Sequence, residues 1–428
     1  MEISEIYKIF EQSTGVCTDT RKIEKGNLFF ALKGPNFNGN QYAQKAFELG
    51  ASFCVIDEAA FSIPNKTIMV NDCLEALQQL ANYHRRQLQI PIIGIAGSNG
   101  KTTTKELIYS VLSTTLKTFA TKGNLNNHIG VPLTLLSIDK SVQIAAIELG
   151  ANHVGELELL CKIAEPNFGI ITNNGLDHLE GYGSFEGVVK GNSELYYWLL
   201  THNGVAFVNS TDELLVRMAS RFNNAVYYGS QKNKTYTTVE SGSILLKLKS
   251  KTGKIIDTQL IGSYNIHNIN AALCIADYFE IDENVAIEAI KNYVPSNNRS
   301  QLVSVGTNQV VLDCYNANPS SMESSIESFS KIDAANKVLM LGDMFELGNY
   351  SSGEHRKLIE FCQKHSFSDT YYCGKEFSLH KNDFKMEKFF ETREMLEAHL
   401  KSHPIQNATI LIKGSRGMAM EKLLDYLK

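Results

Sequence analysis

The run GIAGSNGKTTT, residues 94–104, has the residue types of a phosphate-binding loop. Lys101 could reach the β- and γ-phosphates of a nucleotide, and Thr102 could place its hydroxyl on Mg²⁺. The Walker A pattern would require a glycine at position 95, where this chain has Ile95. A glycine turn with an ordinary surface lysine is therefore the alternative interpretation.

The segments on either side favour the phosphate loop. The apolar run IPIIGIA, residues 90–96, predicts a strand buried on both faces of a parallel sheet, and residues 101–112 predict a helix. A glycine turn between a strand and a helix points several backbone N–H groups at one anion, and the helix dipole adds to them. The sequence therefore predicts nucleotide binding by Gly97, Ser98, Asn99, Gly100, Lys101, Thr102 and Thr103.

Two further strand ends carry polar residues that could complete such a site. Glu148 ends the otherwise apolar run VQIAAIE, and the next strand, FGIIT, is followed by a polar loop that contains His178. Open α/β sheets bind ligands at the carboxyl edge of their strands, so Glu148 is a natural Mg²⁺ ligand there. A solvated acid at a strand end is the alternative. The other polar residues of the second loop are Asn173, Asn174, Asp177 and Glu180.

Three asparagine-rich runs could contact a polar substrate or a base. Residues 123–136 (GNLNNHIGVPLTLL) have the composition of a turn before an apolar helix. Asn265 and Asn268 are three apart and share one helical face. The run DCYNANPSS, which begins at Asp313, follows another strand and contains Tyr315, Asn316, Asn318 and Pro319.

The alternation of apolar strands and helices predicts an α/β protein with three domains. Residues 1–88 form a small N-terminal α/β domain, residues 89–300 a doubly wound parallel sheet with the phosphate loop, and residues 301–428 a Rossmann-like α/β domain. Four strand-like runs in the last part begin at residues 310, 337, 369 and 408.

Composition excludes several other classes of protein. The 428 residues carry a net charge of −5, which argues against nucleic acid as a partner, because phosphate-backbone binding needs a basic surface. The eight cysteines form no C-x-x-C or Cys/His zinc spacing. No stretch reaches the length of a membrane span, and the N-terminus does not resemble a signal peptide. We expect a cytoplasmic enzyme.

Together these runs resemble the Mur ligases, the ATP-dependent amide-bond ligases of peptidoglycan synthesis. The phosphate loop of that family reads G-[ST]-x-G-K-[ST], so Ile95 agrees with it. The resemblance covers all three domains in order and is carried by TDTRKIEKGNLFFALKG, GNLNNHIGVPLTLL, IELGANHVGE, HLEGYGS, YNANPSSM, LGDMFELG and LIKGSRGMAMEK. These runs are most similar to the branch that joins D-alanyl-D-alanine to UDP-N-acetylmuramoyl-tripeptide.

The resemblance implies a reaction in which ATP phosphorylates the terminal carboxylate of the UDP-linked tripeptide. The amine of D-alanyl-D-alanine then attacks the acyl phosphate, and the tetrahedral intermediate collapses to the pentapeptide, ADP and phosphate. The residue chemistry agrees, because activating a carboxylate requires a γ-phosphate held by fixed cations such as Lys101 and Mg²⁺. We expect a monomer with ATP and Mg²⁺ as cofactors.

The resemblance also assigns site residues. Lys101, Glu148 and His178 are the expected catalytic residues, and Thr102, Glu148 and His178 surround magnesium. Asn265, Asn268, Arg299, Asp313, Tyr315 and Asn318 line the nucleotide. Asp19 and Arg21 belong to the uridine-nucleotide site, Asn124, Asn126 and Asn127 to the muramoyl-peptide side, and Lys413, Ser415 and Arg416 to the amino-substrate side. Asp343 and Glu346 are further candidates, although either could simply cap a helix.

One position departs from the family pattern. The family usually places a carbamylated lysine in the helix after HLEGYGS, near a second magnesium. In the register of GVVKGNSELY that position is Asn192, which has a neutral carbonyl oxygen and no charge. Lys190 is two residues earlier, about 200° away around a helix. We expect this enzyme to work without a carbamylated lysine.

The sequence leaves two other functions open. A sister Mur ligase would add a single amino acid, although YNANP and NNHIGVP argue against it. A P-loop ATPase or small-molecule kinase would hydrolyse ATP or phosphorylate a hydroxyl group without an amine substrate.

Overall fold

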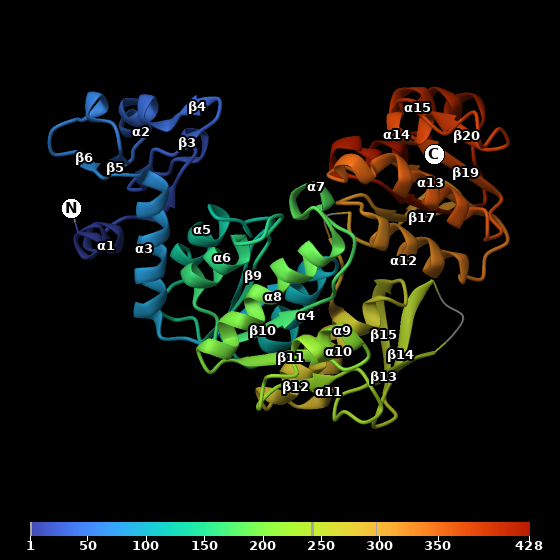
Figure 1. The fold of residues 1–428 in the computed structure, drawn as a ribbon, viewed down its shortest axis with the longest axis horizontal. Coiled ribbons are helices and arrows are strands. Elements are labelled where there is room, and N and C mark those ends of the chain that lie inside the picture. Colours follow the sequence, from blue (N-terminus) through green and yellow to red (C-terminus); the bar gives the residue numbers. More distant parts are fainter. Residues whose placement is uncertain (1, 241–243, 297) are drawn as a thin grey trace.

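The computed structural model describes residues 2–240, 244–296 and 298–428, and it has three parts along the chain (Figure 1). The N-terminal part is a small parallel sheet flanked by helices. Its strands lie in the order β1 (Val16–Cys17), β2 (Leu28–Phe30), β5 (Phe53–Ile56) and β6 (Thr67–Met69). The helices α1 (Ile3–Glu11) and α2 (Ala43–Glu48) and the hairpin β3 (Lys33–Gly34)–β4 (Phe37–Asn38) complete it.

The helix α3 (Cys73–Leu88) attaches this part to the centre of the molecule (Figure 1). The Asp72 carboxylate caps its first turn, and Gln89 ends it in the left-handed conformation, with φ of 51°. The buried Arg85 side chain donates from Nε to the carbonyl of Ala164 at 2.9 Å. His84 is also buried and bonds the carbonyl of Ile138 at 2.8 Å, so α3 belongs to the cores of both parts.

The central part is a six-stranded parallel sheet with helices on both faces. The strand order is β12 (Val226–Tyr228), β11 (Val205–Asn209), β10 (Phe168–Ile171), β7 (Ile92–Ala96), β9 (Ile144–Glu148) and β8 (Thr118–Ala120). One face carries α5 (Gly130–Leu136), α6 (Glu156–Ala164) and α8 (Phe185–Thr201) with α3, and the other carries α4 (Lys101–Leu112), α10 (Asn265–Tyr278) and α11 (Glu283–Asn292). The short helices α7 (Leu179–Tyr182) and α9 (Glu213–Met218) follow β10 and β11.

An antiparallel sheet that the sequence analysis did not predict follows β12. It consists of β13 (Thr237–Glu240), β14 (Leu245–Ser250) and β15 (Ile255–Ile261). Its inner residues alternate with exposed ones, as in a sheet with one solvated face. Leu248 and Ile256 are buried in the same hydrophobic cluster as α10 and α11, so this sheet covers that side of the central part.

The C-terminal part is a mixed six-stranded sheet. The order is β16 (Gln301–Val305), β17 (Asn308–Asp313), β21 (Thr409–Lys413), β18 (Lys337–Gly342), β19 (Asp369–Cys373) and β20 (Lys388–Phe390), and only β16 is antiparallel to its neighbour. Its helices are α12 (Pro319–Ser330), α13 (Ser351–Cys362), α14 (Lys375–Ser378) and α15 (Arg393–Ser402), with the short 3-10 turn η4 (Gly348–Tyr350) before α13. The predicted α/β fold with a central parallel sheet is confirmed.

The state of the cysteines and the character of the helices were also considered in the sequence, and both are visible in the described residues. All eight cysteines are buried with free thiols. Among the described residues, no helix has the length and apolar character needed to cross a membrane.

Two glycines at the third position of their helices provide a stability test. A Cβ at Gly187 of α8 would overlap the carbonyl oxygen of Tyr182, whereas a Cβ at Gly353 of α13 meets nothing within 4 Å. Gly187→Ala should destabilise the chain by about 1–3 kcal/mol, because the backbone at Tyr182 or Gly187 must move to make room for the methyl group. Gly353→Ala should stabilise it by about 0.5–1 kcal/mol through helix propensity. Calorimetric unfolding of both variants measures this, and equal shifts would contradict it.

Candidate active site

A cavity of about 1220 Å³ lies between the central and C-terminal parts. It is formed by the carboxyl ends of the central strands, the start of α4 and α10, and the loops that precede α12 and follow β21. The predicted residues that line it are Ser98, Asn99, Gly100, Lys101, Thr102, Thr103, Asn124, Asn126, Asn127, Glu148, His178, Asn265, Asn268, Arg299, Asp313, Tyr315, Asn318, Lys413 and Arg416.

The turn between β7 and α4 has the backbone of an anion-binding loop. Gly97 and Gly100 have φ of 117° and 81°, in the region that favours glycine. A Cβ on Gly100 would also lie 2.8 Å from Oδ1 of Asn268, so α10 packs directly on the turn. Lys101 folds over the loop and donates from Nζ to the carbonyls of Gly97 and Ser98. Its ammonium is thereby held against the loop, at the edge of the cavity.

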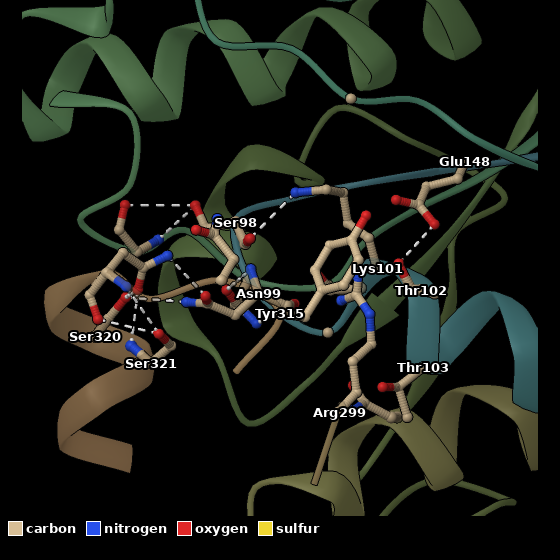
Figure 2. A pocket seen from close by; sticks show the side chains of 18 of the residues that line it. Ser98, Asn99, Lys101, Thr102, Thr103, Glu148, Arg299, Tyr315, Ser320 and Ser321 are labelled. Carbon is tan, nitrogen blue, oxygen red and sulfur yellow. Dashed lines mark hydrogen bonds between the residues drawn. The ribbon is translucent and has the colours of Figure 1, made fainter. Parts of the chain in front are cut away.

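Glu148 lies beside this loop at the end of β9 and is almost fully buried. Its Oε2 accepts a hydrogen bond from the Thr102 hydroxyl at 2.9 Å, and its Oε1 accepts one from the Asn126 side chain at 2.8 Å (Figure 2 shows the Thr102 contact). The ammonium of Lys105 is 4.0 Å from Oε2 and also buried. Burial lowers the pKa of Lys105, while the nearby Glu148 carboxylate opposes that shift.

The loop after β10 holds the phosphate loop through side-chain hydrogen bonds. The buried Asp177 accepts a hydrogen bond from the Ser98 hydroxyl at 2.6 Å. Asn173 accepts from the backbone N–H of Asn99 at 3.1 Å and donates to its carbonyl at 3.0 Å. Asp177 and Asn173, two polar residues of this loop, therefore use their side chains to hold the phosphate loop.

Two guanidinium groups and one aromatic ring line another part of the cavity. The guanidinium carbon of Arg299 lies 3.6 Å from the centre of the Tyr315 ring, and that of Arg416 lies 5.4 Å from it (Figure 2 labels Arg299 and Tyr315). Cation–π contacts of this kind hold charged groups in place without neutralising them. Asn268 donates to Asn265 at 2.7 Å, which confirms that both lie on one face of α10.

A buried ion pair lies where the C-terminal strands end. The ammonium of Lys413 on β21 is 2.6 Å from Oδ2 of Asp313 on the neighbouring β17. Asp313 also accepts hydrogen bonds from the Ser325 hydroxyl at 3.0 Å and from the backbone N–H of Ser300 at 3.3 Å. A buried charge is tolerated only when it is paired and hydrogen-bonded, and both conditions hold here.

The phosphate loop also bonds the C-terminal part directly. The Asn99 side chain accepts from Nδ2 of Asn318 at 2.9 Å and donates to the Ser320 hydroxyl at 2.9 Å (Figure 2). Asn318 meanwhile caps α12 by accepting from the backbone N–H of Ser321 at 2.8 Å. One asparagine of the loop is therefore fixed to the first turn of a helix more than 200 residues away in the chain.

His178 meets the C-terminal part at a second point. Its Nδ1 is 2.6 Å from Oε2 of Glu346, and this hydrogen bond lowers the pKa of the Glu346 carboxyl. Asp343, the other candidate in the same run, accepts from the backbone N–H groups of Glu376 and Phe377 in α14. Asp343 therefore holds a helix start, whereas Glu346 faces the cavity.

Several predicted residues do not line the cavity. Asp19 and Arg21 lie in the N-terminal part and pair with each other at 2.7 Å, with the Arg21 side chain 86% exposed. Ser415 is buried and accepts from the backbone N–H of Phe345 at 2.9 Å, so it holds the loop that carries Glu346. The backbone of Gly97 shapes the phosphate loop without lining the cavity.

Asn192 also lies behind the cavity wall. It is buried on α8, and its Nδ2 donates to Oδ1 of Asn174 at 2.9 Å. Asn174 itself lines the cavity. Lys190 is exposed on another face of the same helix, as the helical spacing predicts.

Sequence reasoning missed several residues in or beside the site, and Lys105 and Ser320 are two of them. Lys105 lies one helical turn after Lys101, and that spacing was the available signal for a second lysine on the same face of α4. Ser320 bonds Asn99 across the two parts, and no local pattern could have indicated that contact.

Models of three Mur ligase domains match the chain in order. Residues 12–85 match the catalytic domain of the Mur ligase family, residues 95–276 the Mur ligase middle domain, and residues 298–416 the glutamate ligase domain of Mur ligases. The chain belongs to the Mur ligase family. The expected resemblance and an ATP-dependent ligase activity are thereby confirmed.

Individual relatives indicate which Mur ligases the chain is similar to. This Mur ligase is 33% identical to the UDP-N-acetylmuramoyl-tripeptide–D-alanyl-D-alanine ligase of Bacillus subtilis, over 98% of this chain and 94% of that one. It is 32% identical to the ligase of that name in Escherichia coli, over 96% and 93% of the two chains. A crystal structure of MurF from Acinetobacter baumannii superposes with a TM-score of 0.88 at 28% identity, covering 98% and 97%.

The phosphate loop gives a direct binding test. Lys101→Ala should weaken ADP binding about 10- to 100-fold, because a charge-assisted hydrogen bond contributes about 1.5–3 kcal/mol. Isothermal titration calorimetry of the full chain measures the change. Lys122→Ala removes an exposed lysine that does not line the cavity and should leave the affinity unchanged. Equal losses in the two variants would refute the assignment.

Proposed function

We propose that this Mur ligase joins D-alanyl-D-alanine to the terminal carboxylate of UDP-N-acetylmuramoyl-tripeptide, with ATP as the energy source. The full-length similarity to ligases of that name carries the proposal. The cavity supports it, because a phosphate loop, a buried carboxylate and several cations face one space between two parts of the chain. Amide ligation by acyl transfer needs these groups together, whereas simple ATP hydrolysis does not need the second part.

In the first step, an oxygen of the substrate carboxylate attacks the γ-phosphorus of ATP. The bond to the β–γ bridging oxygen breaks, which gives an acyl phosphate and ADP. Lys101 and the N–H groups of the phosphate loop neutralise charge on the transferred group. Arg299 and Arg416, both stacked near Tyr315, add fixed positive charge on the nucleotide side.

In the second step, the amine nitrogen attacks the acyl carbon and gives a tetrahedral intermediate. The intermediate collapses when the bond to the phosphate oxygen breaks, and the departing phosphate takes up the proton that the amine loses. Lys413 and Arg416 lie on the C-terminal side of the cavity, where Lys413 is paired with Asp313 and Arg416 suits the anionic end of the dipeptide or the departing phosphate. The product is the substrate plus the dipeptide less one water.

The residues beside the phosphate loop also fit a magnesium ion. Mg²⁺ in nucleotide sites is held by one or two protein oxygen atoms together with phosphates and water, and it shields the charge of the transferring phosphoryl group. Thr102 and Glu148 present such oxygens in direct contact with each other. Among residues 2–240, 244–296 and 298–428, no three His, Cys, Asp or Glu side chains form a closed metal cage, so the nucleotide would supply the remaining ligands.

The UDP-linked substrate would contact two further groups of residues. Asp19 and Arg21 would contact the uridine nucleotide, and Asn124, Asn126 and Asn127 the muramoyl-peptide. The Asn126 side chain also bonds Glu148, which would place this substrate next to the proposed magnesium site. We place the enzyme in the cytoplasm, because its precursor substrates are assembled there. We also propose that it acts as a monomer.

The activity test measures phosphate release and product mass. Purified chain, ATP and UDP-muramoyl-tripeptide are combined with and without D-alanyl-D-alanine, using both the lysine and the diaminopimelate forms of the tripeptide. Phosphate release should require the dipeptide, and the product should be heavier by one dipeptide less water. Release that is indifferent to the dipeptide indicates an ATPase or kinase, and a product with one added amino acid indicates a sister ligase.

Asn192 gives a second prediction. Because Asn192 has no charge and Lys190 points away from the cavity, turnover should be the same in CO₂-depleted buffer and in buffer with added bicarbonate. Lys190→Ala should also retain full turnover. Activity that rises with bicarbonate, or a carbamate on Lys190 in a crystal, would contradict this prediction.

A further inference from the structure

A short segment of the central part is packed into the core of the C-terminal part. Leu179 and Tyr182 of α7 are 3% and 8% exposed, and they share a hydrophobic cluster with Met344 and Leu347. This segment follows the central strand β10, so it belongs to the central part by chain order. Its packing therefore depends on the C-terminal part being docked.

Hydrogen bonds fix the same contact. The backbone N–H of Glu180 donates to the carbonyl of Glu346 at 3.1 Å, and the Tyr350 hydroxyl donates to the carbonyl of Gly183 at 3.0 Å. In Figure 1, α7 lies at the boundary between the central and C-terminal parts. The residue directly before α7 is His178, which lines the large cavity.

The His178–Glu346 pair joins two residues with uncommon backbone conformations. His178 has φ of 47° and Glu346 has φ of 63°, both in the left-handed region. Non-glycine residues in that region cluster at functional sites, where the surrounding structure must hold them in place. Here the Met344 N–H donates to Nε2 of the buried His355 at 3.0 Å, which fixes the loop before Glu346 from its own side.

The pair also determines which ring nitrogen of His178 is available. In the neutral imidazole, a proton on Nδ1 is donated to the Glu346 carboxylate, and the lone pair of Nε2 then remains for a ligand. Metal-ligating histidines commonly have this arrangement, with a carboxylate on the other ring nitrogen. Glu346 also lines a second cavity of about 580 Å³ in the C-terminal part.

We propose that Glu346 is a positioning residue that orients His178 when the C-terminal part docks, and so completes the phosphate and metal side of the cavity. The inference rests on the proposed function, because it concerns the site where ATP and magnesium would act. It means that full metal binding requires a docked C-terminal part. The Glu346 carboxylate links His178 to the C-terminal part. The Glu346 side chain is 56% exposed, so its removal takes away little packing.

The test compares Glu346→Ala, Glu346→Gln and Glu346→Gly in the full-length chain. Glu346→Ala should weaken Mn²⁺ binding to the enzyme–ADP complex and raise the KM for Mg²⁺, each about tenfold or more, as expected for a residue that supports a metal ligand. Glu346→Gln keeps an acceptor oxygen and should recover part of the loss. Electron paramagnetic resonance measures free Mn²⁺, and turnover at varied Mg²⁺ gives KM and kcat separately.

Glu346→Gly separates positioning from stability. Glycine adopts a φ of 63° freely, so the unfolding temperature should be unchanged or higher while Mn²⁺ affinity is still lost. Glu180→Gln is the matched control, because the Glu180 side chain is exposed and only its backbone makes the contact. Its metal affinity should equal that of the unmodified chain.

A double-mutant cycle completes the test. Glu346→Ala should add no further loss of Mn²⁺ affinity in a His178→Ala background, because Glu346 acts through His178. Additive losses, or Glu346 variants with unchanged metal affinity, would overturn the inference and leave the ligase proposal intact. Absence of the pentapeptide product from the unmodified chain would instead overturn the ligase proposal.

Discussion

The turn between β7 and α4 is the constraint on which the site depends. Its glycines leave no room for side chains, because α10 and the loop after β10 pack directly against Gly100 and Gly97. The two residues between them, Ser98 and Asn99, have polar side chains that bond in different directions. Ser98 donates to Asp177 within the central part, and Asn99 bonds Asn318 of the C-terminal part. A loop of four residues therefore fixes both walls of the cavity.

Several of the chain's cations line the cavity beside this turn. The chain as a whole is acidic, with a net charge of −5, yet the cavity gathers Lys101, Arg299, Lys413 and Arg416. Lys413 is neutralised by Asp313, whereas the two arginines stack at Tyr315 and keep their charge available. Among the cations of the cavity, the two arginines are therefore available to small anionic substrates, beside acidic side chains such as Glu148 and Glu346 that also line it.

Local patterns in the sequence predicted the parts of the structure that depend on neighbouring residues. The apolar run before Gly97 and the glycine spacing predicted β7, the turn and α4. The antiparallel strands β13–β15 were not predicted, because the alternation of Leu248 and Ile256 with exposed residues is a weaker signal than the continuous apolar runs of the parallel strands. The three-residue spacing of Asn265 and Asn268 predicted their shared face correctly.

Contacts between distant segments could not be predicted in the same way. Asn173 and Asp177 have the side chains of ligands, and only the fold shows that they hold the phosphate loop. The partner of His178 is 168 positions later, at a residue for which helix capping was an equally good reading of the sequence. The capping role belongs instead to Asp343, three residues earlier.

The contacts between the central and C-terminal parts are suited to reversible docking. Each hydrogen bond of Asn99, Glu180 and Tyr350 across the boundary contributes about 0.5–1.5 kcal/mol. Burial of Leu179 and Tyr182 contributes about 1.5–3 kcal/mol for each side chain, and ordering the loops offsets part of that gain. A balance of a few kcal/mol is within the range that differential ligand affinity can shift. A ligase must assemble its site around three substrates and then release three products, and docking of moderate strength satisfies both requirements.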